Sequence, residues 1–287
     1  MVLAEEFTRY RPYLFAVAYH ILGEVQEAED VLQDVVTACL EAPTKPIQHP
    51  KAYLTRMVAN QSIDRLKVLK KQRAVYTGTW LPEPLITPER SDGIASEGIL
   101  SYEVLHALEN LTPTERAVFV LREAFDYPYR EMASWLNTTE ANCRQLLRRA
   151  RQKIAVRPTA PAPSSGLETL MRAFLHACQE QNLEALLQLL HEDVAMYSDG
   201  GGKVSAAVHP VLGRRSVGKF FLGLARKGLA TIPVVVDVNG QTGFLYTAAD
   251  GTPATLVLVA LEHHAVKRFF IVRNPDKLKI LLQSVTK

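Results

Sequence analysis

The stretch YREMASWLNTTEANCRQLLRRARQKI, residues 129–154, contains the pattern that decides the fold of the first half of the chain. Residues 129–136 predict a short helix, and Asn137 to Thr139 predict a turn whose last hydroxyl can cap the next helix. In that next helix the apolar side chains recur at steps of four, three and four, as Cys143, Leu147, Ala150 and Ile154. A short helix, a turn and a second helix with one apolar stripe predict a helix-turn-helix.

The second helix of this motif carries its basic side chains away from the apolar stripe. A helix that enters the major groove needs this division, because one side packs on its own domain while the other presents donors to bases and phosphates. Arg144 and Gln145 lie nearest the helix start, where bases are contacted, and later residues such as Lys153 would meet phosphates. We expect DNA contacts from Thr139, Asn142, Arg144, Gln145, Arg148 and Arg149. The alternative is a basic helix that faces only solvent.

The residues before this motif are also predicted to be helical. Apolar side chains repeat at three- and four-residue steps over residues 7–21, 28–39 and 52–71, and Gly23 stands where the first of these helices would stop. Further along, Thr112, Pro113 and Glu115 predict a helix start with a cap, a proline at the first position and a capping box. The first half of the chain is therefore expected to be all-α.

Charge is distributed unevenly along these helices, although the whole chain has 33 basic and 30 acidic residues. Residues 24–41 contain six acids and no Lys or Arg, residues 51–73 contain seven bases and one acid, and residues 140–157 contain six bases and one acid. The stretch at 80–110 is acidic again. Two basic segments separated by an acidic one suggest two contacts with one polyanion, and solvated helix faces are the alternative.

The helix at residues 52–71 has one polar face, opposite Leu54, Val58 and Leu69. That face comprises Arg56, Asn60, Asp64, Lys67 and Lys71. The uncharged Asn60 is a candidate base contact, and the lysines would neutralise phosphates. In the acidic helix one face carries Asp30, Gln33 and Asp34. This face would repel DNA, so we expect it to contact another protein. For each face, simple exposure to solvent is the alternative.

Composition excludes several classes of protein. The chain has 287 residues, 47% of them hydrophobic and 22% charged, which excludes wholesale disorder and fits two or three domains. The longest near-continuous apolar run, residues 254–261, is far shorter than the roughly 18 residues that cross a bilayer. The N-terminus carries two acids and no apolar segment of the secretory type. The three cysteines, Cys39, Cys143 and Cys178, form no CxxC pair, so we expect reduced thiols and a cytoplasmic protein.

Two linkers divide the chain. Residues 77–97 contain three prolines and two glycines and predict an extended segment, and residues 157–166 are rich in Pro, Ala and Ser. Beyond the second linker two short helices at 167–190 and a helix at 216–227 accompany strand-length runs at 194–197, 204–208, 232–238, 243–246, 254–261 and 265–272. This last part is predicted to be α+β, with helices on a curved, mostly antiparallel sheet.

Three segments in this order resemble bacterial sigma factors of the extracytoplasmic-function group. AEDVLQDVV (28–36) resembles the segment that docks on RNA polymerase, AYLTRMVANQSIDRLK (52–67) the segment that melts and recognises the minus-ten element, and residues 111–154 the domain that recognises the minus-thirty-five element. The resemblance implies polymerase contacts from Asp30, Leu32, Gln33 and Asp34, and minus-ten contacts from Arg56, Asn60, Asp64, Arg65, Lys67, Lys70 and Lys71. It also implies capture of a flipped base near the Pro43–Pro50 loop. Tyr53 is a candidate to help there, and a place in the core is the alternative for its ring. A sigma factor performs no chemistry of its own.

Three further motifs are similar to those of a subgroup, SigJ-type factors, whose C-terminal SnoaL-like domain has a cone-shaped α+β fold. They are Trp80, Leu81, Pro82, Glu83 and Pro84; Asp199, Gly200, Gly201, Gly202 and Lys203; and Asn274, Pro275, Asp276, Lys277 and Leu278. In that subgroup the extension is taken to regulate the sigma factor within one chain. Trp80 offers an apolar anchor, consecutive glycines allow close backbone approach, and Lys203 can pair with Glu83. An ordinary turn is the alternative for the glycines.

The resemblance implies five segments: sigma domain 2 (1–75), a linker (76–105), sigma domain 4 (106–157), a second linker (158–166) and the SnoaL-like domain (167–287). The expected partners are core RNA polymerase and promoter DNA, with a small-molecule ligand of the last domain left open. No HxxxCxxC motif of a zinc anti-sigma partner is present, and we expect no membrane contact, metal or cofactor.

Two other functions stay open on the sequence alone. A conventional helix-turn-helix regulator would explain residues 129–154 but neither the acidic helix nor the second basic one. A catalytic SnoaL-type domain would need an acid–base pair, and its candidates are His191, Asp193, Asp199 and His209. Their spacing does not bind them into such a pair, and a fold shared with enzymes confers no activity. We therefore expect no enzyme.

Overall fold

A computed structural model describes residues 2–41, 47–86, 100–154, 164–227, 232–248 and 250–281. The chain divides into two compact units. Unit 1 comprises residues 1–74 and 88–158, and unit 2 comprises residues 75–87 and 159–287. The N-terminal part of the predicted first linker thus belongs to the same compact unit as the C-terminal domain. Among the described residues no helix combines the length and the hydropathy that a bilayer span needs.

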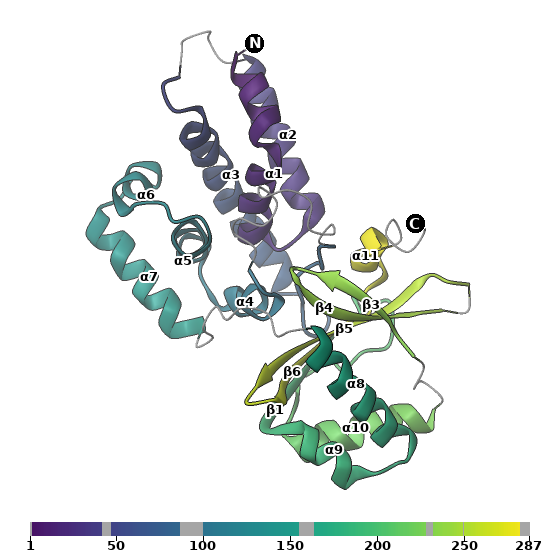
Figure 1. The fold of residues 1–287 in the computed structure, drawn as a ribbon. Helices are drawn as coiled ribbons and strands as arrows, with labels where there is room; N and C mark the ends of the chain where they lie inside the picture. The colour runs from purple at the N-terminus through teal and green to yellow at the C-terminus, as the bar shows by residue number, and fades with distance from the viewer. Residues whose placement is uncertain are drawn as a thin grey trace. The chain divides into compact units, whose positions relative to one another are not determined.

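Unit 1 is helical. Its first three helices, α1 (Val2–Leu22), α2 (Val25–Glu41) and α3 (Pro50–Arg73), pack against one another (Figure 1). The predicted apolar stripes form the core of this bundle, where Leu14, Val17, Val35, Leu54 and Val58 have no exposed surface. Gly23, whose φ of 78° favours glycine, ends α1 and accounts for the stop that the sequence predicts.

The remaining elements of unit 1 are α4 (Tyr102–Ala107), the 3-10 turn η1 (Leu108–Asn110), α5 (Pro113–Phe119), the π turn η2 (Val120–Ala124), α6 (Tyr129–Trp135) and α7 (Glu140–Ile154). Thr112 and Glu115 form the predicted capping box at the start of α5. Both α5 and α6 pack on α7 (Figure 1). The predicted stripe of α7 is buried, so the helix-turn-helix is confirmed. Helix α4 begins within the segment expected to be a linker, because Ser101 caps it and Tyr102, Val104 and Leu105 bury their side chains.

Unit 2 is a six-stranded sheet in the order β2-β1-β6-β5-β4-β3 with helices on it. The strands are β1 (Leu190–Asp199), β2 (Val211–Leu212), β3 (Val234–Val238), β4 (Gln241–Thr247), β5 (Pro253–Glu262) and β6 (Ala265–Val272). Only the β1–β6 pair is parallel among these, so the predicted mostly antiparallel sheet is confirmed. The helices are α8 (Ser164–Gln179), α9 (Leu183–Leu189), α10 (Arg214–Arg226) and α11 (Pro275–Leu278), followed by the 3-10 turn η3 (Lys279–Leu281). Helix α8 begins two residues before the end of the expected second linker.

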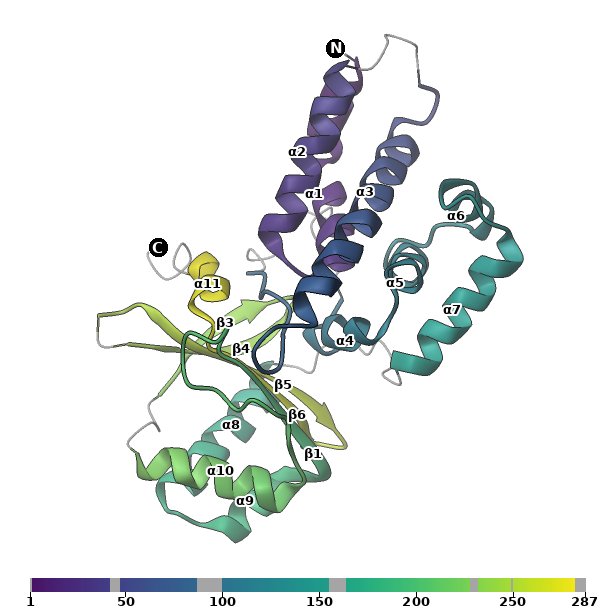
Figure 2. The same ribbon diagram turned by 180° about the vertical axis from the view of Figure 1, so that it is seen from behind.

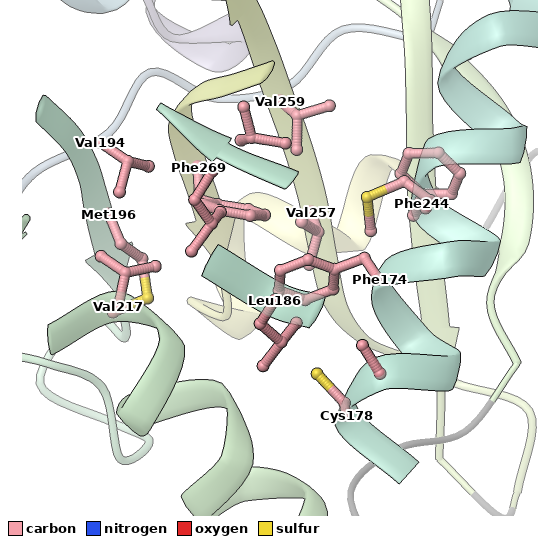
Figure 3. Packing of buried hydrophobic residues seen from close by; sticks show 14 of the residues in the cluster. Phe174, Cys178, Leu186, Val194, Met196, Val217, Phe244, Val257, Val259 and Phe269 are labelled. Carbon is pink, nitrogen blue, oxygen red and sulfur yellow. The ribbon is translucent and has the colours of Figure 1, made fainter. Parts of the chain in front are cut away.

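Helices α8, α9 and α10 lie on one side of the sheet and α11 lies on the other in both views (Figure 1, Figure 2). Alternate side chains of a strand point to opposite faces, so each strand contributes to two layers. Phe174, Leu186, Met196, Val257 and Phe269 belong to the cluster beneath the three helices (Figure 3). On β5 the intervening residues Leu256 and Leu258 are also fully buried, so the second face of the sheet is covered as well.

One predicted strand is wrong. Residues 204–208 form no strand, and Val204 and Val208 are 38% and 55% exposed. The positive φ angles of Gly201 and Gly202 reverse the chain just before this segment, and the backbone N–H of Val204 donates back to the Gly200 carbonyl. With neither face buried, β-branched side chains alone do not stabilise a strand.

Candidate nucleic-acid interface and linker site

The exposed face of α7 carries the residues that the sequence predicts for DNA binding. Thr139, Asn142, Arg144, Gln145, Arg148 and Arg149 are all exposed, opposite the buried stripe. Thr139 Oγ1 accepts from the Asn142 backbone N–H at 3.1 Å and so caps the helix. The Arg144 guanidinium lies 2.8 Å from Glu140 and 4.9 Å from the centre of the Tyr129 ring. These contacts hold the Arg144 side chain in place at the helix start. Arg148 and Arg149 point away from the apolar stripe of α7, and neither forms an ion pair within the described residues.

Two basic side chains nearer the C-terminus of α7 form ion pairs with acidic residues of the protein itself. Lys153, expected at a phosphate, donates to both carboxylate oxygens of Glu115 at 2.8 and 2.7 Å. Burial raises the pKa of Glu115, but bonds from Lys153 and Thr112 outweigh it and lower the pKa overall. Arg151 pairs with Glu123 at 2.6 Å. The C-terminal turn of α7 is therefore tied to α5 and η2, and only its first turns remain available to a ligand.

The polar face of α3 borders a small, mostly apolar pocket of about 360 Å³. It is lined by Tyr53, Arg56, Met57, Asn60 and Gln61. Tyr53 is 38% exposed and presents a ring that a base can stack on, and Asn60 presents an amide. Gln61, which sequence reasoning did not single out, has a buried side-chain oxygen with no hydrogen-bond partner in the described residues. An unsatisfied buried acceptor beside a pocket is a candidate for a ligand's donor group.

The acidic face of α2 lines a second groove, of about 530 Å³, between α2 and α3. Asp30, Gln33 and Asp34 border it from α2, and Asp64 and Arg65 border it from α3. A guanidinium nitrogen of Arg65 lies 3.8 Å from Asp30, and Arg65 also pairs with Glu27. The Glu27 hydrogen bond raises the pKa of Arg65 further. Arg65 therefore lies between the acidic face of α2 and the polar face of α3, and its guanidinium pairs with the acidic side chains of α2.

Two residues predicted for binding instead have structural roles. Leu32 is only 2% exposed and belongs to the core of the three-helix bundle, so it supports the acidic face from beneath. Lys70 is half-buried, and its ammonium donates to the Glu109 backbone oxygen at 2.8 Å. Burial lowers the pKa of Lys70, although Glu109 opposes the effect. The resemblance assigned both residues to a binding face, but contacts with other elements decide where they point. The beginning of the Pro43–Pro50 loop lies outside the described residues.

A buried charge network joins the three-helix bundle to the second half of unit 1. The Arg116 side chain has no exposed surface and pairs with Glu109, while its Nε donates to the His20 backbone oxygen at 3.1 Å. Arg73 lies 2.9 Å from Glu109 and 2.7 Å from Glu24. Burial raises the pKa of Glu109, but Arg116 and Arg73 outweigh this and lower it overall. Breaking such a network leaves an uncompensated buried charge.

Aromatic and hydroxyl groups make a second contact between the same two parts. Tyr127, between η2 and α6, receives a hydrogen bond of 2.9 Å from the Tyr13 hydroxyl of α1 and lies 2.9 Å from the Thr55 hydroxyl of α3. Phe125 meets the Tyr13 ring edge-on at 5.1 Å. In this structure the helix-turn-helix half of unit 1 is thus packed on α1 and α3.

We predict that this network makes unit 1 sensitive to acid. Burial lowers the pKa of His20 to about 4 and the charge of Arg116 lowers it too, although the hydrogen bond from Nδ1 to the Ala16 oxygen at 2.6 Å opposes the shift. The neutral ring also accepts from the Leu100 N–H at 3.2 Å. The unfolded chain protonates this histidine near pH 6.5, so stability present above pH 6.5 is lost as the pH falls towards 4. The loss is about 3 kcal/mol.

Urea unfolding between pH 7 and 4, followed by hydrogen exchange in α1, measures this loss. The variant His20→Gln, which keeps a donor and an acceptor, should show a flatter profile. Superimposable profiles for the two proteins would contradict the role of His20. Burial also lowers the pKa of His106 to about 4, so part of the slope will remain in the variant.

In unit 2, residues 76–86 are bound through a carboxylate at the end of β1. Asp199 has a fully buried side chain and accepts from the Tyr76 hydroxyl at 2.6 Å, the Leu81 N–H at 2.9 Å and the Gly201 N–H at 2.9 Å. Lys277 lies 2.7 Å from Asp199 and donates to the Leu81 oxygen. We call the group Tyr76, Leu81, Asp199, Asn274 and Lys277 the linker site.

Each of the three motifs contributes to this site. The Lys277 ammonium lies 4.1 Å from the centre of the Trp80 ring, so Trp80 forms a cation–π contact as well as an apolar one. Asn274 Nδ2 donates to the Tyr76 hydroxyl at 3.0 Å, and its Oδ1 accepts from the Asp276 N–H. Pro82 and Pro84 are buried. Lys203, expected to pair with Glu83, binds Asp276 instead.

The glycines of residues 200–202 are required by close packing. A Cβ on Gly200 would lie 2.3 Å from the Val204 oxygen, and a Cβ on Gly201 would lie 2.5 Å from the Asn274 side chain. Gly201 and Gly202 also have positive φ angles. The turn that sequence reasoning left as an alternative is therefore present, and the Asn274 side chain packs directly against Gly201 of this turn.

The linker contact extends beyond the predicted motif at both ends. Tyr76 precedes the motif, and sequence reasoning missed it because one tyrosine in a polar segment gives no signal. After the motif, Leu85 exchanges hydrogen bonds with Asn239, whose φ is positive, and Ile86 forms an antiparallel bridge with Val238 of β3. Residues 76–86 therefore lie along unit 2 from the linker site to the sheet edge.

The four catalytic candidates form no single cluster, although the Asp193 backbone N–H donates to His191 Nδ1 at 3.2 Å. Asp199 is held in the linker site, whereas Asp193 and His209 are exposed. His191 lies near Glu262 and His263, but the Lys267 ammonium stands among them, 2.9 Å from Glu262 and 3.1 Å from His191. The layer between the sheet and its helices is filled with apolar side chains (Figure 3).

Comparison with known proteins identifies the first unit. Residues 7–72 match the family described as Sigma-70 region 2, and residues 101–154 match Sigma-70, region 4. A sigma factor of Mycobacterium tuberculosis, "ECF RNA polymerase sigma factor SigJ", is 33% identical over 288 residues, which cover 95% of this chain and 92% of the relative. The chain belongs to the extracytoplasmic-function sigma factors.

Two further comparisons extend over the same length. The "Probable ECF RNA polymerase sigma factor SigI" of M. tuberculosis is 30% identical and covers 94% of this sigma factor and 92% of the relative. The crystal structure of M. tuberculosis SigJ superposes with a TM-score of 0.76 and 31% identity, over 95% of this chain and 97% of that one. This sigma factor therefore directs RNA polymerase to promoters, and it shares both units with SigJ.

Proposed function

We propose that this sigma factor contacts the minus-thirty-five element through α7, the minus-ten element through α3 and core polymerase through α2. The α7 contacts are Thr139, Asn142, Arg144, Gln145, Arg148 and Arg149. The α3 contacts are Arg56, Asn60, Asp64, Lys67 and Lys71, with Tyr53 and Gln61 at the pocket, and the polymerase contacts are Asp30, Gln33 and Asp34. Support comes from the exposure of most of these side chains, with Asp30, Asn60 and Gln61 partly buried, and from the two grooves that the α2 and α3 residues border.

We predict that Arg144→Ala and Gln145→Ala will each weaken promoter binding by the holoenzyme about 10-fold to 100-fold, since a good base contact is worth about 1 to 3 kcal/mol. The loss should vanish on promoters whose minus-thirty-five element is scrambled. Arg151→Ala is the matched control, because Arg151 lies on the same helix but binds Glu123. Electrophoretic mobility shifts with core polymerase measure the effect. A loss of equal size for Arg151→Ala would contradict the assignment.

We further propose that unit 2 regulates the sigma factor by holding the linker, and that it does so without catalysis. The observation that carries this proposal is the buried Asp199 carboxylate, whose acceptors are used by the linker residues Tyr76 and Leu81 and by Lys277. Release of the linker withdraws the Tyr76 and Leu81 donors from the buried carboxylate, and a buried acceptor left without its donors costs free energy. The bound state is favoured for that reason.

Chain length explains how linker capture affects promoter recognition. Residues 74–101, 28 in all, separate α3 from α4, and a fully extended chain of that length reaches about 95 Å. With residues 76–86 bound, residues 87–101 remain before α4, and these 15 residues reach about 50 Å. The minus-ten and minus-thirty-five elements are about 25 base pairs apart, or roughly 85 Å along the duplex. Capture of the linker therefore restricts the separation of the two DNA-binding faces.

A further inference from the structure

Helix α10 of unit 2 presents a basic face that the proposed function does not use. Its sequence, RRSVGKFFLGLAR, contains no acidic residue. Val217, Gly218 and Leu222 are buried on one side. At 100° per residue the exposed side brings together Arg215, Lys219, Gly223, Arg226 and the following Lys227 within an arc of about 120°. We call the four bases of this arc the α10 stripe.

The bases of the α10 stripe form no ion pair within the described part of the chain. Elsewhere in unit 2 exposed lysines are commonly paired, as Lys203 and Lys279 are with Asp276. The nearest acid, Glu192, lies 3.8 Å from Arg214, outside the stripe, and Arg226 donates to the neutral Gln181. Unpaired exposed bases occur also on the proposed DNA-binding faces, at Arg56, Lys71, Arg148 and Arg149. The stripe therefore has the same electrostatic character as those faces.

Gly223 is a second, independent observation. Glycine is the poorest helix former after proline, so a glycine inside an exposed helix needs a reason. A Cβ built on Gly223 would have no atom within 4 Å, so packing within the protein does not require glycine there. Gly223 lies between Lys219 and Arg226 on the same arc. A missing side chain between two bases lets an external backbone approach the helix closely.

The spacing and chemistry of the stripe fit the backbone of a DNA duplex. Arg215 and Arg226 are eleven residues apart, which is about 16 Å along the helix axis. A duplex carries about one negative charge per 1.7 Å, so a stripe of this length can neutralise several phosphates. The arc carries no large exposed apolar side chain, which a membrane-binding helix would insert into lipid. DNA held by α3 and α7 of the same chain is also present at high effective concentration.

We propose that the α10 stripe binds the sugar-phosphate backbone of DNA without regard to sequence. Unit 2 then adds a third DNA contact to the two of unit 1, beyond its role in holding the linker. The contact needs no particular promoter, because phosphates carry no sequence information.

The test uses the full-length chain and a 40-base-pair duplex of arbitrary sequence, with binding followed by fluorescence anisotropy over a range of salt concentrations. The variant Arg215→Ser/Lys219→Ser should bind roughly threefold to tenfold more weakly at low salt. Its slope of log K against log salt should be shallower by about 2, one for each lost phosphate contact. The matched control is Lys203→Ser/Lys279→Ser, which removes the same charge from unit 2 at paired positions.

A further variant retains all four basic residues of the α10 stripe. Gly223→Glu fills open space and places a negative charge within the stripe, so it should weaken binding without lowering the temperature of thermal unfolding. Equal losses for the stripe variant and the control would reduce the effect to net charge and overturn the proposal. So would unchanged binding for both stripe variants. Stripe-dependent binding to phosphatidylserine vesicles without any DNA effect would assign the surface to a membrane instead.

Discussion

Lys277→Ala should destabilise unit 2 by about 3 to 5 kcal/mol, because it leaves the Asp199 carboxylate buried without its cation. The Asp199 side chain has no exposed surface and that of Lys277 is 9% exposed, so water cannot replace the ammonium. The same change removes the donor to the Leu81 oxygen and the cation over the Trp80 ring. We therefore expect the linker to be released as well. Urea unfolding and limited proteolysis of residues 76–86 measure the two effects.

Lys203→Ala is the matched control for this change. Lys203 also pairs with an aspartate in unit 2, but its side chain is 56% exposed and that of Asp276 is 46% exposed. An exposed pair contributes at most about 1 kcal/mol. The control should thus leave both the unfolding midpoint and the proteolysis pattern close to those of the parent. If Lys277→Ala resembled Lys203→Ala in both measurements, the linker site would not hold the linker.

Arg116→Ala is expected to have an effect of similar size in unit 1. It removes a guanidinium that is completely buried between Glu109 and the His20 backbone oxygen, and it leaves a cavity at the junction of α1 and α5. Loss of one partner from a buried pair costs about 3 to 5 kcal/mol. Arg73 still faces Glu109 at 2.9 Å, which places the expected value at the lower end.

Chemical unfolding monitored by hydrogen exchange in α1 and α5 measures this change. Both helices should lose protection together, because Arg116 is a contact between them. Arg151→Ala, which breaks an ion pair whose arginine is 60% exposed, should change the unfolding free energy by less than about 1 kcal/mol. Protection that was lost in α5 alone would show that the network does not join the two halves of unit 1.

The regular elements could be predicted because their signals are local. The stripe of Cys143, Leu147, Ala150 and Ile154 determines which side of α7 is buried, so its opposite side must face solvent. The capping box of Thr112 and Glu115 likewise depends on four adjacent residues. The near-continuous apolar run of β5 marks a strand that is buried on both faces. In each case the information lies within a few residues of the element that forms.

The parts that sequence reasoning missed depend on contacts between distant residues. Lys70 lies on a helix whose periodicity favours an exposed face, yet it binds Glu109, 39 residues away. Tyr76 and Asn274 are 198 residues apart and share one hydrogen bond. The three motifs offer Lys203 two acidic partners, Glu83 and Asp276. Only the folded turn at Gly201 and Gly202 places Lys203 beside Asp276. The motifs themselves were identified by resemblance, which indicated that they belong together but not which atoms meet.

The most direct test of linker capture is transcription in vitro with core polymerase on promoters that differ only in the spacer between the minus-ten and minus-thirty-five elements. A captured linker should give the parent protein a narrow range of active spacers, since the 15 residues left between the bound segment and α4 limit how far α3 and α7 separate. Lys277→Ala, which frees residues 76–86, should broaden that range towards longer spacers, whereas Lys203→Ala should not. Identical spacer profiles for the parent and Lys277→Ala would contradict the account.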